Sequence, residues 1–383
     1  MKVLTVFGTR PEAIKLAPVI KGLEAHGKFT SIVCVTAQHR QMLDQVLGIF
    51  DIKPDYDLDI MASNQTLYDI TARGLLGMRP VIEEARPDVV LVQGDTTTTF
   101  VGSLAAFYER VPVAHVEAGL RTYDKYRPFP EEVNRRLTSQ IADFHFAPTG
   151  VSRDNLLKEG VDPRKVHVTG NTVIDSLLMV TAAQSAEKEK RKWTDFFGKL
   201  GLPINDGRKI ILVTGHRREN FGEGFDNICA ALKEIASSAP DADIVYPVHL
   251  NPNVQGVVRG VLSGIKNVYL LPTLEYEPFV YLMSKSYMIL TDSGGVQEEA
   301  PSLGKPVLVM RDTTERPEGV AAGTVRLVGT DRNKIVTETL NILNDTKAYM
   351  SMSSAHNPYG DGQAAKTIVR ILEKGLIANE AVA

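Results

Sequence analysis

The sequence predicts an α/β protein that is built from two doubly wound, Rossmann-like domains. Three observations support this prediction. The chain has 383 residues, which is too many for a single core of ordinary size and suits two domains. Short β-branched segments alternate with amphipathic segments in both halves, as in parallel sheets covered by helices. The β-branched segments are continuously apolar, which is typical of strands buried on both faces.

The first half of the chain alternates most regularly. Its apolar segments predict strands at residues 3–7, 31–36, 89–93, 113–117 and 144–147. The amphipathic segments between them predict helices at residues 11–25, 38–50, 66–85 and 97–109. This order predicts a parallel sheet with helices on both of its faces.

The alternation weakens at residues 180–207, which contain the single Trp193, and then resumes. The resumed pattern predicts strands at residues 209–214, 243–248, 268–271, 288–291 and 306–310, and helices near 225–237 and 278–285. We therefore expect an N-terminal domain over residues 1–175 and a C-terminal domain over residues 176–365. Residues 366–383 are expected to form a last helix that packs back on the first domain.

Composition and charge exclude several classes of protein. The formal net charge is only −3, so the chain lacks the field that attracts nucleic acid or anionic lipid. Cys34 and Cys229 each lie in an apolar segment, which favours buried free thiols over a disulfide framework or a cysteine-bound metal. No signal-peptide pattern opens the sequence, and no apolar run approaches the roughly 20 residues that span a bilayer. We expect a soluble, cytoplasmic protein.

Polar clusters follow the predicted strands, where open α/β sheets bind their ligands. In the first cluster, Gly8 permits a sharp turn and Pro11 suits the first position of a helix. Free amides at that helix start would bind an anion together with Arg10, and Lys15 lies one turn further on. An ordinary strand-to-helix turn is the alternative. The cluster is neither a Walker A loop nor GxGxxG, so nothing here indicates ATP, NAD or another cofactor.

Three carboxylates, Asp95, Glu117 and Glu131, lie at or after predicted strand ends. We expect them to meet at one edge of the sheet, beside Arg135 or Arg136. Grouped carboxylates raise one another's pKa and can divide acid and base roles at neutral pH. Asp95 by itself could be a helix cap, and the group could be a plain salt-bridge cluster. Metal binding is a weaker alternative, because no His-rich spacing accompanies these residues.

The second half contains residues that suit a nucleotide diphosphate. His216 and two arginines follow a glycine at the end of one strand, and His249, which is equally compatible with a structural role, follows the next. Another strand ends in Ser293-Gly294-Gly295 directly before a helix, so that backbone amides can approach a phosphate.

Two further side chains complete this nucleotide-binding pattern. Glu299 lies about one turn into the helix that follows the two glycines, where it would accept hydrogen bonds from ribose hydroxyls. Phe279 offers an aromatic surface for a base, with a core aromatic as the alternative.

These clusters, in this order, resemble those of the non-hydrolysing UDP-N-acetylglucosamine 2-epimerase family. The matching segments span nearly the whole chain, at residues 7–12, 94–97, 115–121, 130–132, 216–220, 291–299 and 357–362. The resemblance implies a GT-B architecture, in which two Rossmann-like domains face a central cleft, and a homodimer that uses neither NAD nor metal. In the family, UDP is eliminated across C1–C2 to give 2-acetamidoglucal. UDP adds back after the proton has returned to C2 from the opposite face.

The resemblance also implies roles for individual residues. The acid/base group would comprise Asp95, Glu117 and Glu131, with His216 as a fourth catalytic residue that also holds the diphosphate. Further ligands of UDP would be Arg10, Ser293, Gly294, Gly295, Glu299 for the ribose and Phe279 for the uracil. Other cleft residues would be Lys15, Arg136 and Arg316.

Some family members bind a second UDP-N-acetylglucosamine as an activator. Residues 36–42 resemble that segment, which makes Gln38, His39, Arg40 and Gln41 the candidate activator residues. The loop at residues 62–65 lacks an arginine that some activated members have there.

N-acetylmannosamine derivatives indicate a role in surface polysaccharide synthesis.

Three other functions are compatible with the same fold, because a fold does not determine a function. A glycosyltransferase would need an acceptor and would not exchange the C2 proton. A hydrolysing relative would release UDP and free N-acetylmannosamine. A non-catalytic sensor of sugar nucleotides has no use for three convergent carboxylates, so their presence favours catalysis.

Overall fold

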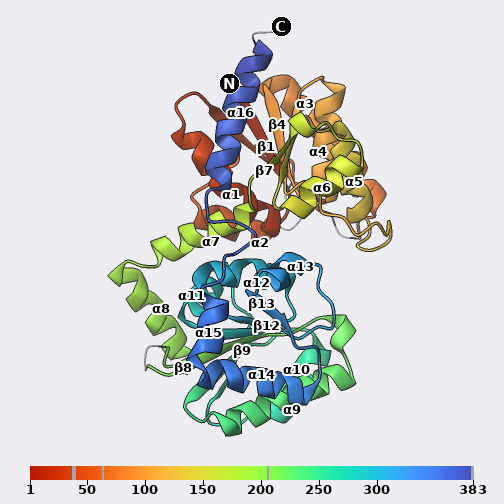
Figure 1. Ribbon diagram of the computed structural model, residues 1–383. Coiled ribbons are helices and arrows are strands. Elements are labelled where there is room, and N and C mark those ends of the chain that lie inside the picture. Colours follow the sequence, from red (N-terminus) through yellow and green to blue (C-terminus); the bar gives the residue numbers. More distant parts are fainter. Residues whose placement is uncertain (37–39, 63, 205–206, 381–383) are drawn as a thin grey trace. The chain divides into compact units, whose positions relative to one another are not determined.

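The computed structural model describes residues 1–36, 40–62, 64–204 and 207–380 (Figure 1). The contacts divide the chain into two compact units. Unit 1 consists of residues 1–176 together with the described residues from 359 onward, and unit 2 consists of residues 177–358. Each unit contains its own parallel sheet between layers of helices, so the prediction of two doubly wound α/β domains is confirmed.

The sheet of unit 1 has the strand order β3-β2-β1-β4-β5-β6-β7, and every pairing in its described part is parallel. The strands are β1 (Lys2–Phe7), β2 (Thr30–Val35), β3 (Tyr56–Asp57), β4 (Val89–Gln93), β5 (Val113–Val116), β6 (Phe144–Ala147) and β7 (Val166–Val168). The chain first winds outward from β1 to β3 and then returns to the other side of β1. The order of the strands therefore reverses between β1 and β4.

Helices cover this sheet, and the last helix of the chain lies against the first. The helices that start in unit 1 are α1 (Arg10–Ala25), α2 (Arg40–Ile49), α3 (Leu67–Ala85), α4 (Thr97–Tyr108), α5 (Glu131–Ile141), α6 (Gly150–Lys158), the 3-10 turn η1 (Pro163–Lys165), α7 (Thr172–Ala183) and α16 (Ala364–Glu380). Helix α16 contacts α1 (Figure 1). The Nζ atom of Lys28, just after α1, donates to Glu373 of α16 at 2.6 Å.

The sheet of unit 2 repeats this arrangement with the order β10-β9-β8-β11-β12-β13, again with parallel pairings. Its strands are β8 (Lys209–Thr214), β9 (Ala242–Pro247), β10 (Val268–Leu271), β11 (Met288–Thr291), β12 (Val307–Val309) and β13 (Val325–Leu327). Its helices are α8 (Glu187–Lys199), η2 (Arg218–Asn220), α9 (Glu223–Ser238), α10 (Pro252–Leu262), α11 (Tyr276–Lys285), α12 (Gly294–Glu299), η3 (Ala300–Leu303), α13 (Pro317–Ala321), α14 (Arg332–Asn344) and α15 (Thr346–Ser353). The order of the strands reverses between β8 and β11.

The predicted strands of both units agree with the observed ones to within one or two residues. The short strands β3, β7 and β13 were not predicted, because two or three residues show no periodicity unless they lie in a longer apolar run, as those of β12 do. The weakly patterned residues 180–207 include α8, which buries Trp193 and Phe197. Both rings lie about 6 Å from the ring of Tyr281 in α11, at 6.0 and 6.1 Å between centroids, so that these aromatic side chains attach α8 to unit 2.

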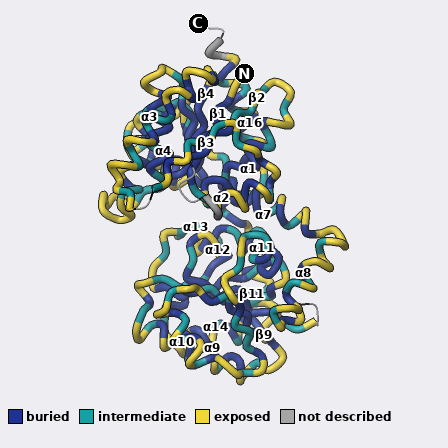
Figure 2. Tube along the Cα trace, turned by 180° about the vertical axis from the view of Figure 1, so that it is seen from behind, coloured by how far each residue is buried: buried dark blue, intermediate teal, exposed yellow. Residues whose placement is uncertain are grey.

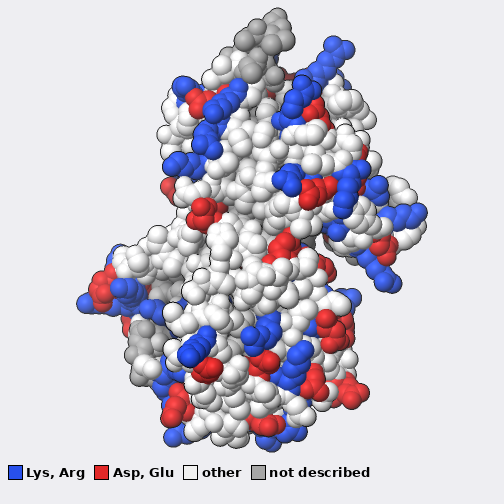
Figure 3. All heavy atoms as spheres, viewed as in Figure 1, with Lys and Arg blue, Asp and Glu red and all other residues white. Residues whose placement is uncertain are grey.

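The strands form the core of each unit, and the helices present their outer faces to solvent (Figure 2). Cys34 in β2 and Cys229 in α9 are both buried and not bridged. Lysine, arginine and carboxylate side chains are interspersed over the surface seen in Figure 3. Within the described residues, no helix combines the length and the apolar character needed to cross a membrane.

The packing of α16 against the sheet of unit 1 can be tested by substituting a glycine of this helix. A Cβ atom on Gly375 would lie 2.4 Å from Cε1 of Phe144, whereas a Cβ atom on the exposed helical Gly256 of α10 would have no neighbour within 4 Å. Gly375→Ala is expected to lower the free energy of unfolding by about 1–3 kcal/mol through overpacking. Gly256→Ala is expected to raise it by about 1 kcal/mol, because alanine has the higher helix propensity. Urea unfolding measures both values, and a stabilising Gly375→Ala would contradict the described packing.

Candidate active site

In each unit, polar loops lie at the point where the order of the strands reverses. In open α/β sheets the ligand binds beyond the carboxyl ends of the strands at such a reversal. In unit 1, Gly8 follows β1 and Gly94 follows β4. In unit 2, Gly215 follows β8 and Asp292 follows β11. These four positions begin the clusters that the sequence singles out.

The first loop of unit 1 is held by the buried carboxylate of Glu12. Its Oε2 accepts hydrogen bonds from the amides of Gly8 (3.1 Å) and Thr9 (2.8 Å), and its Oε1 accepts one from the hydroxyl of Thr96 (2.7 Å). Burial raises the pKa of Glu12, and these hydrogen bonds oppose the rise. The prediction that free amides of this turn bind an anion is therefore wrong for Gly8 and Thr9. The pattern Thr-x-x-Glu, a capping box, could have revealed this in the sequence.

Arg10 follows this capped turn as the first residue of α1 and is half-buried. Its guanidinium makes no hydrogen bond or ion pair with any other described residue. Its guanidinium therefore keeps its donors available for an anion, although the neighbouring amides are occupied.

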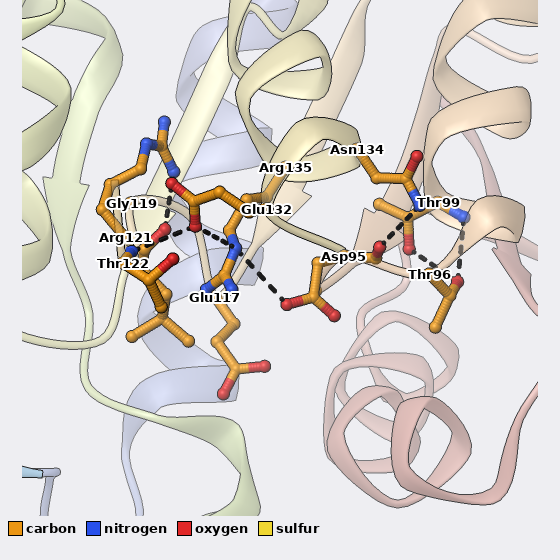
Figure 4. Close-up of polar contacts among 12 residues, drawn as sticks. Asp95, Thr96, Thr99, Glu117, Gly119, Arg121, Thr122, Glu132, Asn134 and Arg135 are labelled. Carbon is orange, nitrogen blue, oxygen red and sulfur yellow. Dashed lines mark hydrogen bonds and ion pairs between the residues drawn. The ribbon is translucent and has the colours of Figure 1, made fainter. Parts of the chain in front are cut away.

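Glu117 directly follows β5, near Asp95 and Arg135 (Figure 4). Its carboxylate lies at the centre of a network of donors. Lys15 donates to both of its carboxylate oxygens, at 2.6 and 2.7 Å, and the side-chain amide of Gln93 donates to Oε2. The side-chain amide of Asn171 donates to Oε1 at 3.3 Å. A carboxylate that accepts from so many donors is ionised, because a protonated oxygen would itself need an acceptor. Glu117 also has a φ of 62°, a left-handed conformation that is uncommon outside glycine and often found at functional sites.

Asp95 lies beside this network, after β4, with 30% of its side chain exposed. Its carboxylate is 3.7 Å from Nε of Arg135. Burial raises the pKa of Asp95; Arg135 and Lys15 oppose the rise, and the charges of Glu117 and Glu131 add to it. Glu117 and Glu131 thus both lie within electrostatic reach of Asp95. The cap of α4 is not Asp95 but Thr96, whose hydroxyl accepts from the amide of Thr99 at 3.1 Å.

Two successive glutamates at the start of α5 have different surroundings. Glu131 is half-buried, and its Oε2 is buried without a hydrogen-bond partner among the described residues. Glu132 is fully buried and accepts from the amides of Thr122 and Tyr123, each at 3.0 Å. Glu132 therefore fixes the loop before the helix, whereas the buried Oε2 of Glu131 has no such role among the described residues.

The structure also distinguishes the two neighbouring arginines of α5. Arg135 is buried between Asp95 and Glu132, at 3.7 and 3.2 Å (Figure 4). Arg136 is 52% exposed and lies 3.6 Å from Glu159. Of the two arginines that the sequence left open, Arg135 is the one beside the carboxylates of Asp95 and Glu132.

His115 precedes Glu117 in β5 and is a structural residue. It is fully buried, and its Nε2 is 2.7 Å from the carbonyl oxygen of Gly94. Burial lowers the pKa of His115 to about 3, so the ring is neutral at physiological pH. The imidazole positions the turn that leads to Asp95.

In unit 2, Asp292 fixes the loop that carries His216. One of its oxygens, Oδ2, accepts from the amides of His216 (2.7 Å) and Arg217 (2.8 Å). Burial lowers the pKa of His216, Asp292 opposes this shift, and His249 and Arg217 add to it. The ring of His249 is stacked on that of His216, with 5.0 Å between centroids and 13° between planes. His249 is thus an exposed neighbour of the candidate site.

The Ser-Gly-Gly segment begins α12, as its sequence predicts. The amide of Ser293 donates to the hydroxyl of Thr291 at 2.9 Å, so this amide is not free for a phosphate. Gly295 is exposed. A Cβ atom on Gly294 would lie 3.9 Å from Nη2 of Arg217, which places that guanidinium next to the turn. Gly294 is buried, so Gly295 and the half-buried Arg217 form the accessible part of this candidate anion site.

The other candidate ligand-binding residues of unit 2 include Arg316 and Phe279. Their neighbours could not be predicted from the sequence. Arg316 forms an ion pair with the buried carboxylate of Glu298, and Asn357 donates to the carbonyl oxygen of Glu298 at 2.9 Å. Phe279 is half-buried on α11, one turn after Tyr276. Burial, with the charge of Glu299, raises the pKa of Tyr276 well above its usual value.

Most of the candidate activator segment lies outside the residues that the structure describes. Gln38 and His39 are outside the described residues, and Arg40 and Gln41 are described only as the first backbone positions of α2.

Comparison with known proteins agrees with this fold and these clusters. The sequence profile of UDP-N-acetylglucosamine 2-epimerase matches residues 21–373. The chain is 58% identical over 380 residues to the UDP-N-acetylglucosamine 2-epimerase of Escherichia coli K12, covering 99% of this chain and 100% of the relative. A structure of UDP-GlcNAc 2-epimerase from Neisseria meningitidis bound to UDP-GlcNAc superimposes with a TM-score of 0.87 and 55% identity, covering 98% of this chain and 100% of that one.

A second structure, of a Listeria monocytogenes protein assigned as a UDP-N-acetylglucosamine 2-epimerase, has a TM-score of 0.91 and 47% identity, with 98% and 97% of the chains covered. The fold and the clusters at the strand ends thus define a GT-B-like isomerase that handles a nucleotide sugar. The chain belongs to the UDP-N-acetylglucosamine 2-epimerase family.

The Glu12 anchor gives a test of the site's first loop. Glu12→Ala would leave the amides of Gly8 and Thr9 without an acceptor, at about 1–3 kcal/mol for each buried donor. We expect it to lower the free energy of unfolding by about 2–5 kcal/mol. Glu12→Gln keeps one oxygen for the amides, and its NH2 group can donate to the threonine hydroxyls, so the loss should stay below about 1.5 kcal/mol. Equal losses in the two variants, measured by urea unfolding, would show that the amides do not depend on this carboxylate.

Proposed function

We propose that the chain catalyses the reversible epimerisation at C2 of UDP-N-acetylglucosamine to UDP-N-acetylmannosamine, through elimination and re-addition of UDP with 2-acetamidoglucal as intermediate. The family membership supports this substrate, as do relatives whose structures contain UDP-GlcNAc or UDP. The observation that carries the chemistry is the pair of neighbouring carboxylates in unit 1: Glu117, which is held ionised, and Asp95, whose pKa is raised. No cofactor is required by this reaction.

We assign the removal of the C2 proton to Glu117. The electron pair of the C2–H bond forms the C1=C2 double bond, and the C1–O bond breaks, so that UDP leaves with that bonding pair. Glu117 starts this step as an acceptor, because Lys15, Gln93 and Asn171 all donate to it. A base of this kind contributes about 10²–10⁴-fold to the rate.

Lys15 is assigned a second role in the reaction, in addition to its contact with Glu117. While it is bound to Glu117, its charge keeps the carboxylate ionised but also weakens it as a base. The diphosphate of a bound substrate would compete for the same ammonium group. Transfer of Lys15 from Glu117 to the diphosphate would strengthen the base and stabilise the leaving group in the same event.

Asp95 is assigned as the acid that returns a proton to C2 from the opposite face of the glycal. Burial raises its pKa, so it carries a proton more readily near neutral pH than an exposed aspartate does. After this protonation, an oxygen of UDP attacks C1 and restores the glycosyl bond. Glu131, the third carboxylate, adds negative charge that supports the protonated form of Asp95.

The residues of unit 2 are assigned to UDP. His216, the amides of Gly294 and Gly295, and Arg316 would hold the diphosphate, with Ser293 beside them. Arg10 is also assigned to UDP. Glu299 would accept from the ribose, and Phe279 would contact the uracil. Such donors stabilise the charge that develops on the leaving group, which is the most effective form of help for this step.

The resemblance supports several further assignments. We propose that the enzyme acts as a homodimer in the cytoplasm and supplies surface polysaccharide synthesis. We also propose that a second UDP-N-acetylglucosamine binds as an activator at Gln38, His39, Arg40 and Gln41. A structure of the Methanocaldococcus jannaschii UDP-GlcNAc 2-epimerase in complex with both UDP-GlcNAc and UDP, 34% identical to this chain, is compatible with two nucleotide ligands.

Isotope exchange tests the proposed reaction against its rivals. The protein is incubated with UDP-N-acetylglucosamine in D₂O and the sugar is followed by NMR. We expect deuterium at C2, a mixture of the two epimers and little free UDP. Accumulating UDP and free N-acetylmannosamine would instead identify a hydrolysing enzyme. Unchanged substrate would exclude the epimerase and favour a glycosyltransferase or a sensor.

The assignment of the base is tested by Glu117→Gln. This change preserves the shape of the side chain but removes its ability to take a proton, so turnover should fall at least about 100-fold. The affinity for UDP should stay within a few-fold, because Glu117 is assigned to the sugar. Glu109→Gln, at an exposed position after α4, is the matched control and should leave turnover unchanged. Normal turnover by Glu117→Gln would show that another group is the base.

A further inference from the structure

Asp292 is a carboxylate that no step of the proposed reaction uses. It directly follows β11, and its side chain is fully buried, so it presents no surface to a substrate. Its Oδ2 is occupied by the amides of His216 and Arg217. One oxygen of the carboxylate is therefore sufficient to anchor the loop after β8.

The second oxygen of Asp292 faces an imidazole. Oδ1 lies 3.6 Å from Nδ1 of His216 and makes no hydrogen bond within the part of the chain that the structure describes. Buried acceptors nearly always have a partner, because an unpaired one costs about 1–3 kcal/mol. A small rotation of the imidazole would shorten this distance to the roughly 2.7–2.9 Å of a charge-assisted hydrogen bond.

The other edge of the imidazole is directed away from this carboxylate. The two ring nitrogens lie on opposite edges, so Nε2 faces away from Asp292 when Nδ1 faces towards it. The side chain of His216 is 41% exposed, which leaves room for a ligand at that edge. The titratable and charged groups that act on the ring are Asp292, His249 and Arg217, of which only Asp292 is negative.

We propose that Asp292 is a positioning residue that holds the Nδ1–H group of His216 and stabilises its imidazolium form when a diphosphate binds at Nε2. The inference rests on the proposed function in taking a nucleoside diphosphate as the ligand of His216. Two anions on opposite edges of one ring favour its charged form, because each stabilises the positive charge. The imidazolium keeps its protons and only donates hydrogen bonds, so the reaction gains a donor for the leaving group without a net proton transfer.

Asp292→Asn separates this role from that of a simple loop anchor. Asparagine retains a carbonyl oxygen, which can accept from the amides of His216 and Arg217. It replaces Oδ1 by an NH2 group, which cannot accept from Nδ1 and carries no charge. The loop is thereby preserved, whereas the partner of the imidazole is lost.

The binding test uses calorimetry of UDP with the full chain and three variants: Asp292→Asn, His216→Gln and the double variant. In the unchanged protein, affinity should fall as the pH rises through the pKa of the free imidazole, which burial lowers, because the neutral ring then has to gain a proton to bind UDP as the imidazolium. Asp292→Asn should weaken UDP binding about 10-fold near neutral pH and move that fall to lower pH. In the His216→Gln background, Asp292→Asn should change the affinity for UDP by less than about two-fold. The phosphate of UDP itself titrates near pH ~6 in all four proteins alike and cancels in the comparison.

The tautomer of His216 gives a second readout that needs no ligand and no variant. With Asp292 as partner, the neutral ring of the free protein should carry its proton on Nδ1, as observed by ¹⁵N NMR of labelled histidine. A proton on Nε2, or equal losses of UDP affinity from Asp292→Asn in both backgrounds, would overturn the inference.

The outcome also distinguishes this inference from the proposed function. If the protein epimerises its substrate but His216 carries its proton on Nε2, only the role of Asp292 is wrong. If no epimerisation occurs while the NMR and calorimetric results hold, the proposed reaction fails and the role of Asp292 stands.

Discussion

Parallel pairing of the strands is the constraint on which both candidate site regions depend. Because all described strands of a sheet run in one direction, their carboxyl ends lie at one edge, and every loop that follows a strand starts there. The order of the strands reverses beside β1 and beside β8, and open α/β sheets bind their ligands at such positions. Segments as distant in sequence as residues 8–12 and 94–97 become neighbours for this reason.

The same kind of hydrogen-bonded contact holds three of the loops in place. Glu12, Glu132 and Asp292 are buried carboxylates, and each accepts hydrogen bonds from two consecutive backbone amides. The anchored pairs of amides belong to residues 8–9, 122–123 and 216–217. A loop has no ladder of its own to satisfy its amides, so a carboxylate that accepts two of them both lowers the cost of burial and fixes the direction of the chain. The segments that carry Arg10 and His216 are positioned in this way.

The carboxylates assigned to chemistry have different partners. Glu117 is surrounded by side-chain donors, Lys15 among them, and Asp95 lies 3.7 Å from Arg135 with part of its side chain exposed. Side-chain donors can move when a ligand arrives, whereas backbone amides cannot leave their carboxylate without unfolding the loop. The division between mobile and fixed donors thus separates the carboxylates that can exchange protons with a sugar from those that maintain the site.

The sequence by itself determined the fold class, most of the strands and the positions where polar residues follow them, because hydrophobic periodicity and turn residues are local properties of the chain. It also determined the family, through the order of its motifs. Only the tertiary structure decided which neighbour each polar group has. In the tertiary structure, the amides of Gly8 and Thr9 donate to Glu12. Arg135 rather than Arg136 lies beside Asp95, and Arg316 forms an ion pair with Glu298. Such partners are fixed by packing between segments that are far apart in the chain, and no local pattern encodes the distance between them.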